Sequence, residues 1–407
     1  MTKQNSSVMQ SVLSVVLLQA LVVNRGLAFV PPQQHHRVLS SVRVSAAETS
    51  DVKTTKDTVT KTKPKTLGLL TFDLDDTLYP ITPVIDEANA AFARAMGRFG
   101  YEGLTPMDIV QTAKLMREEI AEEDPKAAAI LTHTEIRELA IRREMENIML
   151  AQKLKETADD WATPVSALAD VVVAHAKKWS RTAVSPSIIN AVLTAWEMER
   201  HHAAERHLYP EVLDVLKQIK EEHPDVIIGA VTDGRANPML MTFTLAPYFD
   251  FCMSWEDDQG GRSKFFQELG AVDGEAQLSW IYDAAFEKYK GIREVKDAIK
   301  AEAPPDKESD TPEDRVWIHV GDDLAYDVGG AANSGAKTIL VELADKYEQT
   351  ARLRFDPDYP QPNWSTSLAS ELEQRRVMNK AAEEKIGQKI RFFSQFPGAV
   401  KTILENA

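Results

Sequence analysis

The sequence predicts an α/β protein with a Rossmann-like, mainly parallel sheet and an inserted all-helical domain. Short apolar runs rich in β-branched residues, typical of buried strands, alternate with helical patterns. Between the first two of these runs, residues 81–206 show helical periodicity and almost no strand signal. Strands that alternate with helices indicate a parallel sheet, and a long helical interval between two strands indicates a cap domain beside it.

Composition and charge limit the classes of protein that the chain can belong to. The 407 residues are 43% hydrophobic and 27% charged, which is ordinary for globular proteins and excludes fibrous or wholly disordered chains. The net charge is −15, from 47 basic and 62 acidic residues, so we expect no nucleic-acid partner. The single cysteine, Cys252, excludes an internal disulfide and a CxxC site.

The N-terminal residues 1–47 have the composition of a targeting sequence, because they contain no acidic residue. Their apolar run, residues 12–23, is shorter than the roughly 20 residues of a membrane-spanning helix and fits a signal peptide over residues 1–28. Residues 29–47 fit a transit peptide, and residues 48–66 a disordered linker. The pair resembles the bipartite plastid presequence of diatoms and related algae, which implies a plastid (chloroplast) protein without a membrane anchor in its mature form.

The expected core comprises residues 67–80 and 207–372. We expect strands at 67–72, 226–231, 316–320 and 338–341, and helices at 211–222, about 290–302 and 324–333. Residues 300–315 are expected to form a loop, and residues 373–407 a helical C-terminal tail.

About five helices are expected in the cap, residues 81–206. A capping residue followed by proline marks three helix starts, at Thr105, Thr163 and Ser185. Trp161, Trp179 and Trp196 are expected to pack between the cap helices; stacking on a flavin or pyrimidine ring is the alternative.

Acidic residues follow two of the predicted strands. The segment FDLDDTLYP, residues 72–80, places Asp73, Asp75 and Asp76 after the first strand, and HVGDDLAYD, residues 319–327, places three more after a later one. Those three are Asp322, Asp323 and Asp327. The carboxyl ends of parallel strands share one edge of the sheet, where ligands bind. Such acids repel one another unless a cation is present, and the arrangement suits Mg²⁺.

A third strand, residues 226–231, ends in Thr232-Asp233-Gly234. A hydroxyl and free backbone N–H groups at a strand end can hold a phosphate oxygen. We therefore expect Thr232 and Asp233 to belong to a phosphate site at the same edge of the sheet.

Taken together, DxDxT at residues 73–77, Thr232, a following lysine and GDxxxxD at residues 321–327 resemble the four motifs of the haloacid dehalogenase superfamily with a helical C1-type cap. The resemblance implies that Asp73 is the nucleophile that forms an aspartyl-phosphate and that Asp75 is the general acid and base. It also implies Mg²⁺ on Asp73, Asp75 (through its backbone carbonyl) and Asp322, with support from Asp323 and Asp327.

The lysine of the third motif has two candidates. Lys264 in GGRSKFF is favoured over Lys290 in KYKGIREV, because GRSK followed later by IYDAAFEK resembles one subgroup of phosphatases. That subgroup comprises the bacterial phosphatases of flavin mononucleotide (FMN) and of the riboflavin precursor 5-amino-6-(5-phosphoribitylamino)uracil. KKWSRTAVSP and HVGDDLAYDVGGAANSGAKT extend the likeness.

The expected partner is therefore a small phosphate ester from riboflavin metabolism. The alternatives are a pyrimidine 5′-nucleotidase, a phosphoglycolate phosphatase, or a catalytically silent binding protein with the same fold. The oligomeric state cannot be read from the sequence.

Overall fold

The computed structural model describes residues 65–257, 274–301, 314–350 and 354–407, apart from 357, 363 and 368. Its centre is a six-stranded sheet in the order β3-β2-β1-β4-β5-β6, with every neighbouring pair parallel. The strands are β1 (Thr66–Phe72), β2 (Ile227–Thr232), β3 (Phe251–Ser254), β4 (Arg315–Gly321), β5 (Lys337–Val341) and β6 (Gln388–Ile390). The predicted α/β fold class is confirmed.

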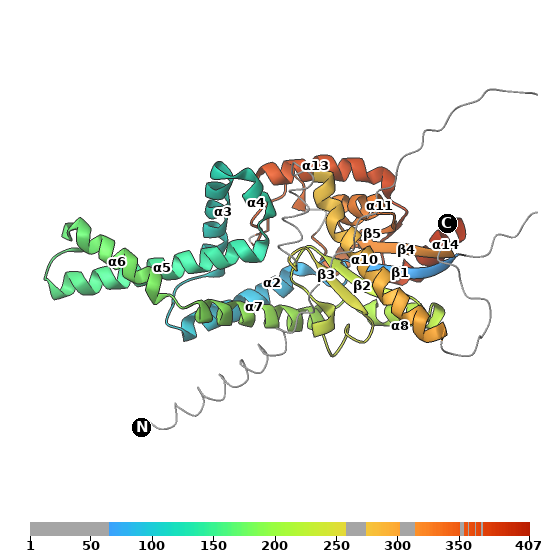
Figure 1. Ribbon diagram of the computed structural model, residues 1–407, viewed down its shortest axis with the longest axis horizontal. Helices are drawn as coiled ribbons and strands as arrows, with labels where there is room; N and C mark the ends of the chain where they lie inside the picture. The colour runs from blue at the N-terminus through green and yellow to red at the C-terminus, as the bar shows by residue number, and fades with distance from the viewer. Residues whose placement is uncertain are drawn as a thin grey trace, which may run out of the picture. The chain divides into compact units, whose positions relative to one another are not determined.

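Helices cover both faces of the sheet (Figure 1). On one face, α8 (Val212–Glu222) and α14 (Phe396–Asn406) pack in a cluster with Leu70 and Phe72 of β1. On the other, α10 (Gly274–Ala301) packs with Leu69 and Trp317. Adjacent residues of β1 thus point to opposite buried faces, which explains the continuous apolar run of this strand.

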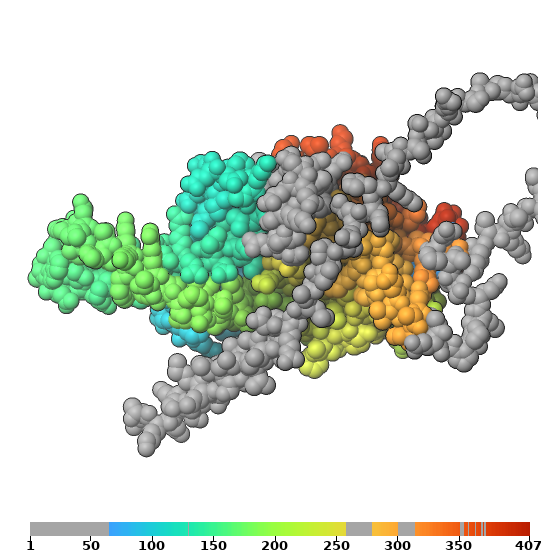
Figure 2. Space-filling view, viewed as in Figure 1, coloured from blue at the N-terminus to red at the C-terminus, as the bar shows by residue number. Residues whose placement is uncertain are grey.

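The cap interval folds entirely into helices and connecting turns. Its helices are α2 (Ile81–Arg98), α3 (Pro106–Glu123), α4 (Pro125–Ile130), α5 (His133–Asp160), α6 (Asp170–Ala183) and α7 (Pro186–His207). Thr105 and Thr132 begin α3 and α5 with capping boxes, which satisfy backbone N–H groups in the first turn. Apolar side chains of these helices, including Phe92, Ile136 and Val192, form the cap's own core. In Figure 2 the hairpin of α5 and α6 projects beyond the other cap helices.

Four details of the predicted elements are wrong. The helix expected at about 290–302 is the second half of α10, which begins at Gly274. The helix expected after Thr163 begins only at Asp170, because residues 165–167 form a separate 3-10 turn. Residues 324–330 form a π-helical turn and only Ala331–Asn333 are α-helical. The tail is not helical throughout, because β6 separates α13 (Ala369–Ala382) from α14 and adds a strand to the sheet.

Cap and core are joined at both ends of the inserted segment. The Tyr209 N–H donates to the Leu78 carbonyl at 3.0 Å, so the chain leaves and re-enters the core side by side. Glu87 of α2 pairs with Arg206 and His207 of α7. None of the helices within the described residues has the length and apolar character needed to cross a membrane.

Candidate active site

The loop after β1 brings Asp73 to the carboxyl edge of the sheet. The Asp73 N–H donates to the Val320 carbonyl of β4 at 2.8 Å, so its backbone continues the strand pairing. The Thr77 hydroxyl lies 2.9 Å from Asp322 Oδ1 and 3.4 Å from Asp73 Oδ2. Thr77 therefore ties the acids that follow β1 to those that follow β4.

Asp76 shapes this loop. Its φ of 57° is left-handed, a conformation that Asp tolerates better than most residues. Its carboxylate accepts hydrogen bonds from the Ile81 N–H at 3.0 Å and from the Thr350 hydroxyl at 2.6 Å. Asp76 thus turns the chain into α2 and anchors it to the segment after β5, which leaves Asp73 and Asp75 to face the cavity.

The turn after β4 presents Asp322, Asp323 and Asp327. Asp327 accepts from the Tyr282 hydroxyl at 2.9 Å and from the Asp323 N–H at 2.9 Å, and lies 3.1 Å from His319 Nε2. Gly321 is required here, because a Cβ would lie 2.1 Å from the Asp327 carboxyl group. Asp327 therefore has partners for both oxygens and holds the turn in place.

Three carboxylates meet where the two loops converge. One oxygen each of Asp73, Asp322 and Asp327 lies within 4.8 Å of the others. Burial, and then the charges of Asp327 and Asp322, raise the pKa of Asp73 well above its usual range. Burial, and then Asp327, raise that of Asp322. Because Asp322 Oδ2 is buried without a hydrogen-bond partner among the described residues, the cluster fits a hard divalent cation.

Asp75 lies beside the cluster and pairs with Arg200 of cap helix α7. Its second oxygen, Oδ1, is buried and has no hydrogen-bond partner within the described part of the chain. Thr232 is buried at the end of β2, and the exposed side chain of Asp233 follows it. All three residues line one cavity with Asp73 and Asp322.

The two candidate lysines differ in what the structure describes. Lys264 lies outside the described residues. Lys290 is on α10, where its ammonium group pairs with Glu287 and lies 5.4 Å from the centre of the Phe286 ring. Lys290 is half-exposed and is not among the described residues that line the cavity of Asp73, Asp75 and Asp322.

Arginines contact the acids from segments that contain no recognisable motif. Arg375 of α13 pairs with Asp323 at 2.5 Å, and Arg354, after β5, lies 3.8 Å from the same carboxylate. Burial would raise the pKa of Asp323, but Arg375 and Arg354 lower it below the ordinary value. Arg200, Arg354 and Arg375 were not predicted, because isolated arginines in helices and loops carry no spacing signal.

Two cavities with shared lining residues lie at the interface of core and cap. The acid pocket, about 40 Å³, is lined by Asp73, Thr232 and Asp322 among others. The main cavity, about 260 Å³, lies between cap, core and the residues after β5. Their linings share Asp75, Asp233, Trp255, Tyr326 and Arg354. The site thus offers a small acidic chamber beside a larger one with both aromatic and charged walls.

The chain is similar to a curated enzyme. It is 27% identical over 283 residues to the 5-amino-6-(5-phospho-D-ribitylamino)uracil phosphatase YigB of Escherichia coli (strain K12), an alignment that covers 68% of this chain and 83% of that protein. No protein-family model matches the chain.

Solved structures give a weaker likeness. A 2-haloacid dehalogenase from Pseudomonas syringae pv. tomato DC3000 is 18% identical with a TM-score of 0.41, covering 83% of this chain and 99% of that one. The magnesium-bound HAD-hydrolase YfnB from Bacillus subtilis is 12% identical with a TM-score of 0.32, covering 83% and 100%. Because both scores lie below 0.5, neither structure bears on the assignment.

The sheet topology, the position of the cap and the similarity to a curated phosphatase agree with the predicted motifs. The predicted motifs follow β1, β2 and β4 of a single parallel sheet, and the helical cap lies between β1 and β2. A curated phosphatase is similar over most of its length. In the order of its motifs, its parallel sheet and its inserted helical cap, the chain is therefore similar to the phosphatases of the haloacid dehalogenase superfamily.

Proposed function

We propose that the protein hydrolyses a small phosphate monoester through an aspartyl-phosphate on Asp73. The observation that carries the proposal is that Asp75 lines both the acid pocket, which also contains Asp73 and Thr232, and the main cavity. A phosphate group in the smaller chamber places its ester oxygen beside Asp75 and its alcohol portion in the larger chamber. Only a substrate with both parts uses both chambers.

In the first step, a carboxylate oxygen of Asp73 attacks phosphorus and the bond to the ester oxygen breaks. Asp75 gives its proton to that oxygen, so a neutral alcohol leaves. In the second step, Asp75 takes a proton from water as the water oxygen attacks phosphorus. The bond from Asp73 to phosphorus breaks, phosphate leaves and both carboxyl groups return to their starting states.

Charge neutralisation is the main requirement of this chemistry, because an anionic nucleophile meets an anionic phosphate. Asp73 and Asp322 would hold Mg²⁺, which would lower this repulsion and favour the ionised form of Asp73. Asp327 and Asp323 would support them through the turn after β4. The buried unpaired oxygen of Asp322 supports this part of the proposal.

The proposed substrate is FMN or 5-amino-6-(5-phosphoribitylamino)uracil. The similarity to YigB and the motif likeness in both core and cap support this choice. A main cavity of about 260 Å³, close to the lower size of small-molecule sites, supports a leaving group larger than glycolate.

A phosphate-release screen with Mg²⁺ tests the proposal. Purified protein is offered FMN, the riboflavin precursor, uridine monophosphate and phosphoglycolate, and kcat/KM is compared. We expect the highest value for FMN or the precursor. A clear preference for phosphoglycolate or uridine monophosphate would overturn the substrate proposal, and release from none of them would overturn the proposed activity.

We further propose that residues 1–47 direct the protein to a plastid. The absence of acidic residues from this segment supports the proposal. A fluorescent protein fused after residue 47 should accumulate in plastids of an algal host with a bipartite import route. Accumulation in the cytosol or the medium would contradict it.

A further inference from the structure

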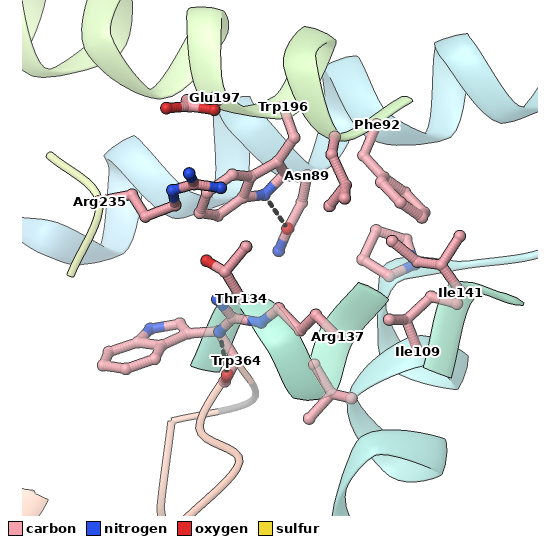
Figure 3. Close-up of a pocket in the computed structure, with 13 residues that line it drawn as sticks. Asn89, Phe92, Ile109, Thr134, Arg137, Ile141, Trp196, Glu197, Arg235 and Trp364 are labelled. Carbon is pink, nitrogen blue, oxygen red and sulfur yellow. Dashed lines mark hydrogen bonds between the residues drawn. The ribbon is translucent and has the colours of Figure 1, made fainter. Parts of the chain in front are cut away.

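The proposed chemistry assigns no role to the wall that the main cavity shares with a smaller pocket in the cap. An apolar pocket of about 40 Å³ shares Thr134, Arg137, Trp196, Arg235 and Trp364 with the main cavity. Its other lining residues are mainly apolar side chains of the cap, including Phe92, Ile109 and Ile141. Figure 3 shows Trp196 and Trp364 on two sides of this space, with Arg137 beside Trp364.

Arg137 of α5 has a partly buried positive charge that forms no ion pair within the described part of the chain, although Glu256 lies near enough to act on its charge. The guanidinium group donates to the Trp364 carbonyl at 3.1 Å and lies 5.6 Å from the centre of the Trp196 ring. No ion pair joins it to a carboxylate of the described residues, whereas Arg200 pairs with Asp75 and Arg375 with Asp323. Burial lowers the pKa of Arg137 to about 10; the charge of Glu256 opposes this shift, and the charges of Arg200 and Arg117 add to it.

A second donor in the same wall, the Trp364 indole N–H, has no acceptor among the described residues. Trp364 Nε1 is buried and makes no hydrogen bond within the described residues. By contrast, Trp196 Nε1 donates to Asn89 at 3.0 Å. A buried N–H without an acceptor costs about 1–3 kcal/mol, so such a group in a cavity wall indicates a ligand that supplies the acceptor.

The Arg137 guanidinium group and the Trp364 indole N–H determine which kind of ligand can bind in this pocket. A guanidinium group has five N–H donors, and its bond to the Trp364 carbonyl leaves others for a ligand. The aromatic and apolar walls favour a flat apolar surface over a strongly hydrated anion such as a second phosphate. The positive charge and the indole N–H require oxygen acceptors at the edge of that surface.

We propose that Arg137 and the Trp364 indole N–H bind the leaving group of the ester, and that this group is a planar heterocycle with carbonyl oxygens at its edge. The inference rests on the proposed function, since it assigns a role to the wall of the same cavity. Arg137 and Trp364 then determine which esters are accepted and take no part in phosphoryl transfer.

Paired substrates test this division of roles. FMN and uridine monophosphate carry such a ring, and ribose 5-phosphate carries the phosphate and sugar alone. Arg137→Gln and Trp364→Phe should each raise KM for the ring-bearing ester that the enzyme accepts by about tenfold, as expected for a lost hydrogen bond. Both should change kcat/KM for ribose 5-phosphate by less than about twofold, because the reacting groups are untouched.

Arg142→Gln is the matched control, because Arg142 is on the same helix and pairs with Glu138 at its surface. It should leave both esters unaffected. An equal loss with both kinds of ester would show that Arg137 only supports the segment around Trp364, and would overturn the inference. So would unchanged KM for the ring-bearing esters in both variants.

Calorimetry with riboflavin and uridine separates this inference from the proposed function, because neither compound has a phosphate to hydrolyse. We expect at least one to bind the wild-type protein and to bind about tenfold more weakly to Arg137→Gln. That result with no ester hydrolysed would refute the activity and keep the subsite. Hydrolysis of the esters without binding of either compound would keep the activity and refute the subsite.

Discussion

At the scale of single residues, the site is a set of buried acids that repel one another. Neighbouring negative charges raise the pKa of Asp73 and Asp322. For the same reason, ionisation of these two groups destabilises the folded protein when no metal is bound. The Thr77 hydroxyl donates to Asp322 and the Tyr282 hydroxyl donates to Asp327, which fixes the positions of these two acids. The negative charges that the proposed reaction needs at these positions therefore lower the stability of the folded protein.

Asp73→Asn separates the two effects. The amide cannot attack phosphorus, so kcat should fall by about a thousandfold or more. In EDTA the variant should melt no lower than the wild-type protein, because a neutral side chain removes a buried charge beside Asp322 and Asp327. Phosphate release and differential scanning calorimetry measure the two outcomes. Retained turnover would show that another group is the nucleophile.

Gly321→Ala tests the close approach of backbone and acid after β4. The new Cβ would overlap the Asp327 carboxyl group, so we expect a loss of about 1–3 kcal/mol in the free energy of unfolding, measured with urea. Gly97→Ala in α2 is the control, because its Cβ meets nothing within 4 Å and should be neutral or stabilising. Equal stability of both variants would contradict the contact.

At the scale of elements, the helix after β5 completes the site. Arg375 of α13 pairs with Asp323 and its guanidinium carbon lies 3.7 Å from the centre of the Tyr326 ring. Asn379 of the same helix accepts a hydrogen bond from the Ala325 N–H at 2.9 Å. The turn that presents Asp322 is therefore fixed from outside by a helix that lies about fifty residues further along the chain.

Arg375→Met should lower the free energy of unfolding by about 2 kcal/mol at pH 7, because Asp323 stays buried with a weaker partner. Asp323 has a lowered pKa in the folded protein, so the ion pair contributes fully above the ordinary carboxyl pKa of about 3.9. The contribution is lost as the pH falls through the lower folded-state pKa.

The difference between wild type and Arg375→Met should accordingly shrink as the pH falls from 6 to 3, which thermal melts at several pH values can follow. Lys380→Met, at an exposed position of the same helix, should show no such trend. A constant difference between Arg375→Met and wild type over this range would contradict the ion pair.

At the scale of the whole molecule, the site exists only where core, cap and C-terminal residues meet. The core supplies Asp73, Thr232 and Asp322, the cap supplies Arg200 and Arg137, and the residues after β5 supply Arg354 and Trp364. His133 of the cap and Thr366, which follows β5, are linked at 2.6 Å. Binding at the centre should therefore stabilise the whole fold.

Mg²⁺ should raise the melting temperature by about 3–6 °C at a hundredfold excess over its Kd, because it binds only the folded protein. EDTA should reverse the shift and abolish phosphate release. Asp322→Asn should remove the response to Mg²⁺, whereas Asp345→Asn at an exposed position should keep it. A full response in Asp322→Asn would place the ion elsewhere.

The sequence predicts four of the six strands, the inserted helices and the acids at the strand ends. Buried strands and helix caps are local patterns, and Asp73 and Asp75 must lie close together because only Leu74 stands between them. It missed the short strands β3 and β6, whose residues 251–254 and 388–390 become strands only by pairing with β2 and β5.

The cations and aromatic rings around those acids could be identified only from the folded structure. Arg137, Arg200 and Arg375 come from three helices, and Trp364 from a connecting segment, so no spacing along the chain relates them. Which ligand these side chains can bind depends on their burial and on the groups that they contact. Both are set by the packing of cap, core and tail. The proposed catalytic acids therefore lie in local sequence motifs, whereas the residues proposed to select the substrate come together only through contacts between distant segments.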